Sequence, residues 1–145
     1  MQLALVSLIV IIVDQLSKYL TVKYMTEGAS IPIIPGVFHL TFIYNRGAAF
    51  GLLENQQWIF ILVALALIAV VFYFRQDIKE ADEYTRFGTA LLLGGAIGNL
   101  IDRIRINMVI DYFDFIIWPI FNIADVAICV GVSMIIWGTW KNSQS

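Results

Sequence analysis

The sequence predicts an all-α membrane bundle of four transmembrane helices with a small β-sheet at the membrane surface. Three observations support this fold class. The 145-residue chain is 60% hydrophobic and only 14% charged, whereas soluble domains carry about 25% charged residues. Four long apolar stretches follow one another, each close to the ~20 residues that a bilayer core requires. Tryptophans stand at the ends of these stretches, as interfacial aromatic residues do: Trp58, Trp118, Trp137 and Trp140.

The predicted helices cover residues 3–22, 58–74, 87–104 and 116–140, and residues 1–145 form a single domain. The first has a polar outer third, the second lacks charge, the third is rich in glycine and the fourth contains Asp125. Four crossings place both termini on the same side of the membrane. Basic residues slightly favour that side as the cytoplasmic one, at positions Arg75, Lys79, Arg86 and Lys141.

Residues 27–54 are predicted to form this small sheet rather than a span. Apolar residues alternate with polar ones here, which is the period-two pattern of a strand, at positions Phe38, Leu40, Phe42 and Tyr44. We expect a small sheet at the membrane surface. Residues 75–86 read as a charged connecting loop.

Composition excludes several classes of function. Cys129 is the only cysteine and His39 the only histidine, so neither an intrachain disulfide nor a zinc site of several Cys and His ligands is expected. A Ser-His-Asp triad would have to use His39, and no GxSxG elbow occurs. The net charge of −2 gives no basic patch, so we expect no nucleic acid partner. We expect no metal and no cofactor.

Charged residues inside the predicted spans require an explanation, since each costs roughly 2.5–3.5 kcal/mol to insert. They lie in or at the ends of the spans, at Asp14, Lys18, Asp102, Arg103 and Asp125. With the amino terminus inside, these residues and the loop that carries Asp111 and Asp114 converge on the outer face.

Two interpretations of these charges are open from the residues alone. In the first they form structural ion pairs, because Asp14 and Lys18 are spaced i,i+4 and Asp102 can pair with Arg103. In the second, Asp111 and Asp125 share one proton, as aspartic protease dyads do. Neither of these two has an adjacent cation, and Asn122 precedes Asp125 by one helical turn.

Five motifs, in order along nearly the whole chain, resemble those of lipoprotein signal peptidase (signal peptidase II). They are Asp14-Gln15-Leu16-Ser17-Lys18, Asn45-Arg46-Gly47-Ala48-Ala49-Phe50, Gly98-Asn99-Leu100-Ile101-Asp102-Arg103, Val109-Ile110-Asp111 and Phe121-Asn122-Ile123-Ala124-Asp125. The resemblance implies a multi-pass aspartic endopeptidase of the bacterial inner membrane. It also implies that residues 27–54 form a small extracytoplasmic β-cradle and that the active site lies on the same side.

In that family the catalytic dyad falls on the positions of Asp111 and Asp125. The resemblance implies supporting roles for the other polar motif positions, which are Asp14, Lys18, Asn45, Arg46, Asn99, Asp102, Arg103 and Asn122. It implies a diacylglyceryl-modified prolipoprotein substrate, cleaved just before the lipidated cysteine. Membrane lipids and a globomycin-type inhibitor are the other expected partners, and we expect a monomer.

The chain departs from the family pattern in two places. Asp114 follows Asp111 by three residues, so two carboxylates compete for the first catalytic position; the spacing from Asp102 favours Asp111. The stretch between Asp111 and Asp125 looks short, which would trim the surface above the site.

Two other classes of function are compatible with intramembrane carboxylates. In a small channel or transporter they would line a pathway, although here they gather toward one face. In a non-catalytic membrane scaffold both aspartates would tolerate replacement by asparagine.

Overall fold

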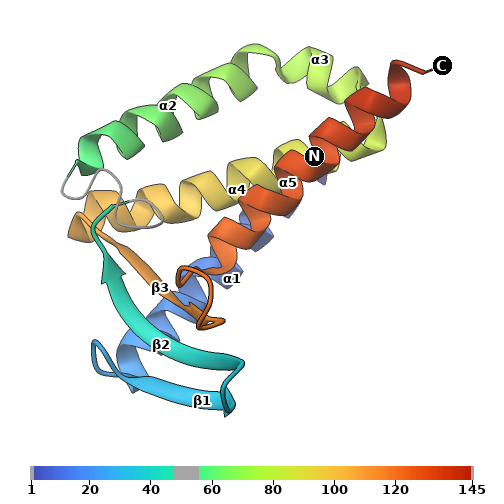
Figure 1. Ribbon diagram of the computed structural model, residues 1–145. Helices are drawn as coiled ribbons and strands as arrows, with labels where there is room; N and C mark the ends of the chain where they lie inside the picture. Colours follow the sequence, from blue (N-terminus) through green and yellow to red (C-terminus); the bar gives the residue numbers. More distant parts are fainter. Residues whose placement is uncertain (1, 48–55, 145) are drawn as a thin grey trace.

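The structure, a computed structural model, describes residues 2–47 and 56–144. Its elements in chain order are α1 (Gln2–Tyr24), β1 (Ser30–Ile34), β2 (Phe38–Asn45), α2 (Gln57–Tyr73), α3 (Arg75–Glu80), α4 (Glu83–Ile106), β3 (Val109–Asp114) and α5 (Ile123–Asn142). Figure 1 shows the sheet at one end of the helical part, with the start of α1 and the end of α5 at the other.

Helices α1, α2 and α4 overlap the predicted ones, but α5 begins at Ile123 and not at residue 116. The apolar run before it is a loop containing Pro119, and Phe121 bridges back to Phe113 of β3. Asn122 then caps α5. Hydropathy cannot separate an apolar loop from the helix that follows, which explains the early predicted start. The short helix α3 lies where a charged loop was predicted.

Two of the described helices are long and apolar enough to cross a membrane, over Leu3–Tyr24 and Ile123–Asn142. Helix α2 is equally apolar but shorter, with 17 residues. Helix α4 has 24 residues and carries charges at both ends. At 1.5 Å per residue, α4 is about 36 Å long, which exceeds the ~30 Å of a bilayer's hydrocarbon core.

The sheet is antiparallel in the order β1-β2-β3. Strands β1 and β2 fall within the predicted cradle, and residues 48–54 of that prediction lie outside the described residues. Strand β3 was not predicted. It pairs with β2 so that Ile43 faces Asp111 and Asn45 faces Val109. This pairing carries Asp111 next to the end of β2.

Small residues let α4 pack closely on α5. A Cβ placed on Gly95 would collide with the carbonyl oxygen of Ala124, and one on Gly88 with that of Gly131. On the α1 side, a Cβ on Gly98 would lie 2.6 Å from a carboxylate oxygen of Asp14. The glycines of α4 therefore allow α1 and α5 to pack closely against it.

Candidate active site

Asp111 lies in the middle of β3, with its side chain turned into the protein. The residue is 1% exposed. Its two carboxylate oxygens accept hydrogen bonds from Asn122 Nδ2 at 2.6 Å and from Asn45 Nδ2 at 2.8 Å. Successive side chains of a strand point to opposite faces, so Asp114 turns away. It accepts from Thr41 Oγ1 at 2.7 Å, so Asp111 is the carboxylate of this strand that lines the cavity.

Asp125 lies in the first turn of α5, where a carboxylate is favoured by the helix dipole. Its side chain accepts from the backbone N–H of Asn122 at 3.1 Å, while Asn122 Oδ1 accepts from the backbone N–H of Asp125 at 2.9 Å. This reciprocal pair is a capping box. The other oxygen of Asp125 accepts from Asn99 Nδ2 at 2.8 Å.

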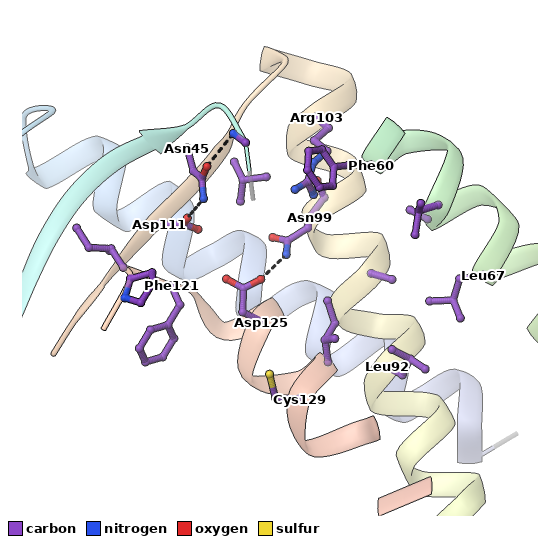
Figure 2. Close-up of a pocket in the computed structure, with 18 of the residues that line it drawn as sticks. Asn45, Phe60, Leu67, Leu92, Asn99, Arg103, Asp111, Phe121, Asp125 and Cys129 are labelled. Atoms are coloured by element: carbon purple, nitrogen blue, oxygen red, sulfur yellow. Dashed lines mark hydrogen bonds between the residues drawn. The ribbon is translucent and has the colours of Figure 1, made fainter. Parts of the chain in front are cut away.

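Asn122 joins the two carboxylates. Its side-chain amide donates to Asp111 and its backbone N–H donates to Asp125. The same Nδ2 lies 3.1 Å from Asn99 Oδ1, and Asn122 is fully buried. Figure 2 shows Asp111 and Asp125 on the same cavity, reached by Asn45 and Asn99 from two further elements.

Burial and, to a smaller extent, the negative charge of Asp125 raise the pKa of Asp111 to about 7. The hydrogen bonds from Asn45 and Asn122 lower it by less. A carboxyl group with this pKa is protonated in about half of the molecules at neutral pH, so the two carboxyl groups can share one proton.

A buried ion cluster is joined to the pair through Asn99. Lys18 Nζ lies 2.9 Å from Asp14, 2.8 Å from Asp102 and 2.9 Å from Asn99 Oδ1. The predicted pair of Asp14 and Lys18 is therefore present. The expected partner of Asp102 was wrong: it pairs with Lys18 and not with Arg103, because adjacent helix residues point about 100° apart.

Asp14 also accepts from the backbone N–H of Ala124 at 3.0 Å, so α1 fixes the first turn of α5. Asn99 is the link from this cluster to the pair. Its oxygen accepts from Lys18 and its Nδ2 donates to Asp125. The amide can hold only this orientation, since a flipped Asn99 would turn its NH₂ toward an ammonium group.

The two arginines among the predicted residues differ in position. Arg103 lines the same cavity as the carboxylates; its Nε donates to Gln57 at 3.2 Å and its guanidinium covers the Phe60 ring at 4.7 Å. Arg46 is exposed at the end of β2, and the described residues give it no hydrogen bond or ion pair. The structure brings Arg103 to the site and leaves Arg46 at its edge.

Sequence reasoning missed two glutamines. Gln15 Nε2 donates to Asp102 at 3.0 Å and lies 3.2 Å from Asp14. Gln57 is 3% exposed, and its Nε2 finds no partner among residues 2–47 and 56–144. Gln15 follows Asp14, and Gln57 precedes Trp58, both of which the sequence analysis named. The available signal was an amide side chain inside or beside an apolar span.

The carboxylates open onto a cavity of about 530 Å³ between α2, α4, α5 and the loop before α5. Its walls are mainly apolar, with Phe60, Leu67, Leu92 and Phe121 around Asp111 and Asp125 (Figure 2). Within the described part of the chain, no three His, Cys, Asp or Glu residues gather as metal ligands.

Two carboxylates joined through buried amides, at an apolar cavity between membrane-length helices, are the arrangement expected of a membrane aspartic peptidase. Comparisons with known proteins show which family this chain belongs to. The family model of signal peptidase (SPase) II matches residues 6–141, and the chain belongs to this family.

Its relatives are similar over nearly their whole length. The lipoprotein signal peptidase of Halothermothrix orenii is 43% identical over 97% of this chain and 96% of the relative. That of Clostridioides difficile is 50% identical over 88% and 86%. A solved structure described as a bacterial membrane enzyme superposes with a TM-score of 0.89 at 34% identity, covering 98% of this chain and 89% of the other.

Proposed function

We propose that this protein removes signal peptides from diacylglyceryl-modified prolipoproteins with Asp111 and Asp125 as its catalytic pair. The activity follows from membership of the signal peptidase II family and from relatives named lipoprotein signal peptidase. The observation that carries the assignment of the residues is the pair itself. Both carboxylates line one cavity, and Asn122 donates a hydrogen bond to each.

We infer that Asp111 is the protonated member of the pair, which its burial and raised pKa support. Asp125, as a carboxylate, takes a proton from a water molecule, whose oxygen attacks the carbonyl carbon of the scissile bond. Asp111 donates its proton to the carbonyl oxygen, giving a neutral tetrahedral diol. The diol then returns a proton to Asp111, and the proton on Asp125 passes to the leaving nitrogen. Both groups end in their starting states.

The apolar walls of the cavity suit the acyl chains of a lipid-modified substrate. Side chains of α2 and α5 line one continuous space with the two carboxylates, among them Val63, Leu67 and Ile128. A diacylglyceryl group held there leaves the peptide bond before the modified cysteine beside the pair. A precursor without acyl chains would leave this apolar space unfilled, so lipidated precursors should be preferred.

We further propose that α1, α2, α4 and α5 all cross the inner membrane, with the pair near the extracytoplasmic face. The sheet, which includes Asp111, lies at one end of the helices, and the start of α1 and the end of α5 lie at the other (Figure 1). The end away from the sheet carries Arg75, Lys79, Arg86 and Lys141, which favours it as the cytoplasmic side.

The test uses purified protein and a diacylglyceryl-modified precursor, with the unlipidated precursor as control. Asp111→Asn and Asp125→Asn should each reduce cleavage by several orders of magnitude, because each removes one proton-transfer group. Undiminished cleavage by either variant removes that residue from the mechanism. Proteoliposome ion flux that depends on Asp125, without peptidase activity, would instead favour a transporter.

A further inference from the structure

A second cavity of about 520 Å³ lies further along α2, toward α3. Its walls come from four helices: α1, α2, α3 and α4. They are lined by aliphatic side chains, including Leu8, Ile11, Ile68, Val71, Leu93 and Ile97. None of the residues proposed for catalysis or its support lines this cavity.

The two hydroxyl groups on the cavity wall already form hydrogen bonds within the protein. Ser7 Oγ donates to the backbone oxygen of Ala90 at 2.8 Å. Thr89 Oγ1 donates to the backbone oxygen of Thr85 at 2.7 Å. Because these hydroxyls already have partners, they do not require a polar ligand. The interior of this cavity, which we call the groove, therefore suits a hydrocarbon chain.

Two cations of α3 stand at one end of this groove. Arg75 and Lys79 both line it and are spaced i,i+4, so they share one helix face. Both are exposed. Arg75 donates one N–H to the Phe72 oxygen at 3.0 Å and lies 4.6 Å from that ring. In the described part of the chain neither cation forms an ion pair with a carboxylate.

An apolar groove that ends in two cations without carboxylate partners is complementary to an anionic amphiphile. Arginine and lysine bind phosphate oxygens through charge-assisted hydrogen bonds. Basic pockets between transmembrane helices are recognised sites for anionic phospholipid headgroups. The position of the groove in the fold agrees with binding of such a headgroup, because α3 connects α2 to α4 at the end away from the sheet (Figure 1).

We propose that this groove binds one anionic phospholipid, with its phosphate between Arg75 and Lys79 and an acyl chain between α1 and α2. The lipid comes from the leaflet opposite the catalytic pair. The groove and the cavity at the catalytic pair share no lining residue. The site is therefore distinct from the substrate cavity.

The experiment measures lipid retention by native mass spectrometry. The purified protein is placed in neutral detergent micelles doped with dioleoylphosphatidylglycerol or with dioleoylphosphatidylcholine. The wild type should retain one phosphatidylglycerol with about 10- to 30-fold preference over phosphatidylcholine, as two surface cations predict. The double variant Arg75→Gln/Lys79→Gln should reduce this preference to less than about 3-fold.

The matched control is Arg86→Gln/Lys141→Gln, which removes the same charge from the same end of the molecule but outside the groove. It should retain the wild-type preference. An equal loss in both double variants would mean that phosphatidylglycerol responds only to diffuse surface charge, and would overturn the proposal. So would a wild type without any preference.

A second variant tests the hydrocarbon half of the site without changing charge. Ala4 is exposed and lines the groove, so Ala4→Trp fills part of the space where the acyl chain should lie. It should lower phosphatidylglycerol retention at least 5-fold. Unchanged retention in this variant would contradict an acyl chain in the groove, even if the headgroup preference were present.

Discussion

Lys18 provides a sharp test of how the catalytic pair is supported. It is 1% exposed and contacts two buried carboxylates, Asp14 and Asp102. Replacing it by methionine keeps the side-chain volume but leaves both acids without a cation. Breaking a buried ion pair by removing one partner costs about 3–5 kcal/mol. For a chain of this length that corresponds to a fall in Tm of about 10–15 °C.

The assay is thermal unfolding of purified Lys18→Met in detergent, followed by cleavage of a lipidated precursor below the Tm. Cleavage should fall as well, because Lys18 orients Asn99, whose Nδ2 donates to Asp125. Lys23→Met is the matched control. Lys23 is an exposed residue of the same helix, and its loss should change stability by no more than about 0.5 kcal/mol.

The triple variant Asp14→Asn/Lys18→Met/Asp102→Asn separates charge from packing. It removes the whole ion cluster, while the asparagine oxygens can still accept from the N–H groups of Ala124 and Ile110. It should regain part of the lost stability, since a neutral core avoids the cost of unpaired charge. A Tm for Lys18→Met within about 2 °C of the wild type would refute this account of the cluster.

Three further predictions concern Gly98, Asp114 and the pH dependence. Gly98→Ala should lower the free energy of unfolding by about 1–3 kcal/mol, measured by thermal unfolding, because its Cβ would collide with Asp14; a neutral effect would contradict the close approach. Asp114→Asn should keep cleavage within about 3-fold, because this side chain faces Thr41 and not the pair; loss as severe as for Asp111→Asn would transfer the catalytic role. The value of kcat/KM should fall as pH rises through about 7, because Asp111 then loses the proton it must donate; a flat profile up to pH 9 would contradict that role.

Hydropathy predicted the long helices because an apolar run of near-bilayer length has few other structures available. It failed at the start of α5, where Ile116 and Ile117 are apolar but lie in a loop. The third strand was missed for another reason. Its pairing partner is β2, so that Asp111 faces a residue 68 positions earlier, Ile43, and no local pattern encodes such a contact.

The candidate site could be predicted as a set of residues but not as a network. Charge in an apolar span singled out Asp14, Lys18 and Asp102, yet which acid meets which cation depends on how α1 packs on α4. Spacing along a strand would have separated Asp111 from Asp114, because positions three apart point to opposite faces. The bridging contacts of Asn122 depend on tertiary structure, since they join α5 to β3.

The central claim is that Asp111 holds a proton because it is buried beside a charged Asp125. Infrared difference titration of the purified protein measures this directly, through the absorbance of a protonated carboxyl group. We predict one such group that titrates near pH 7, is absent in Asp111→Asn, and titrates at lower pH in Asp125→Asn, where the neighbouring charge is gone. A titration near pH 7 that persists in Asp111→Asn, or does not move in Asp125→Asn, would contradict the shared-proton pair.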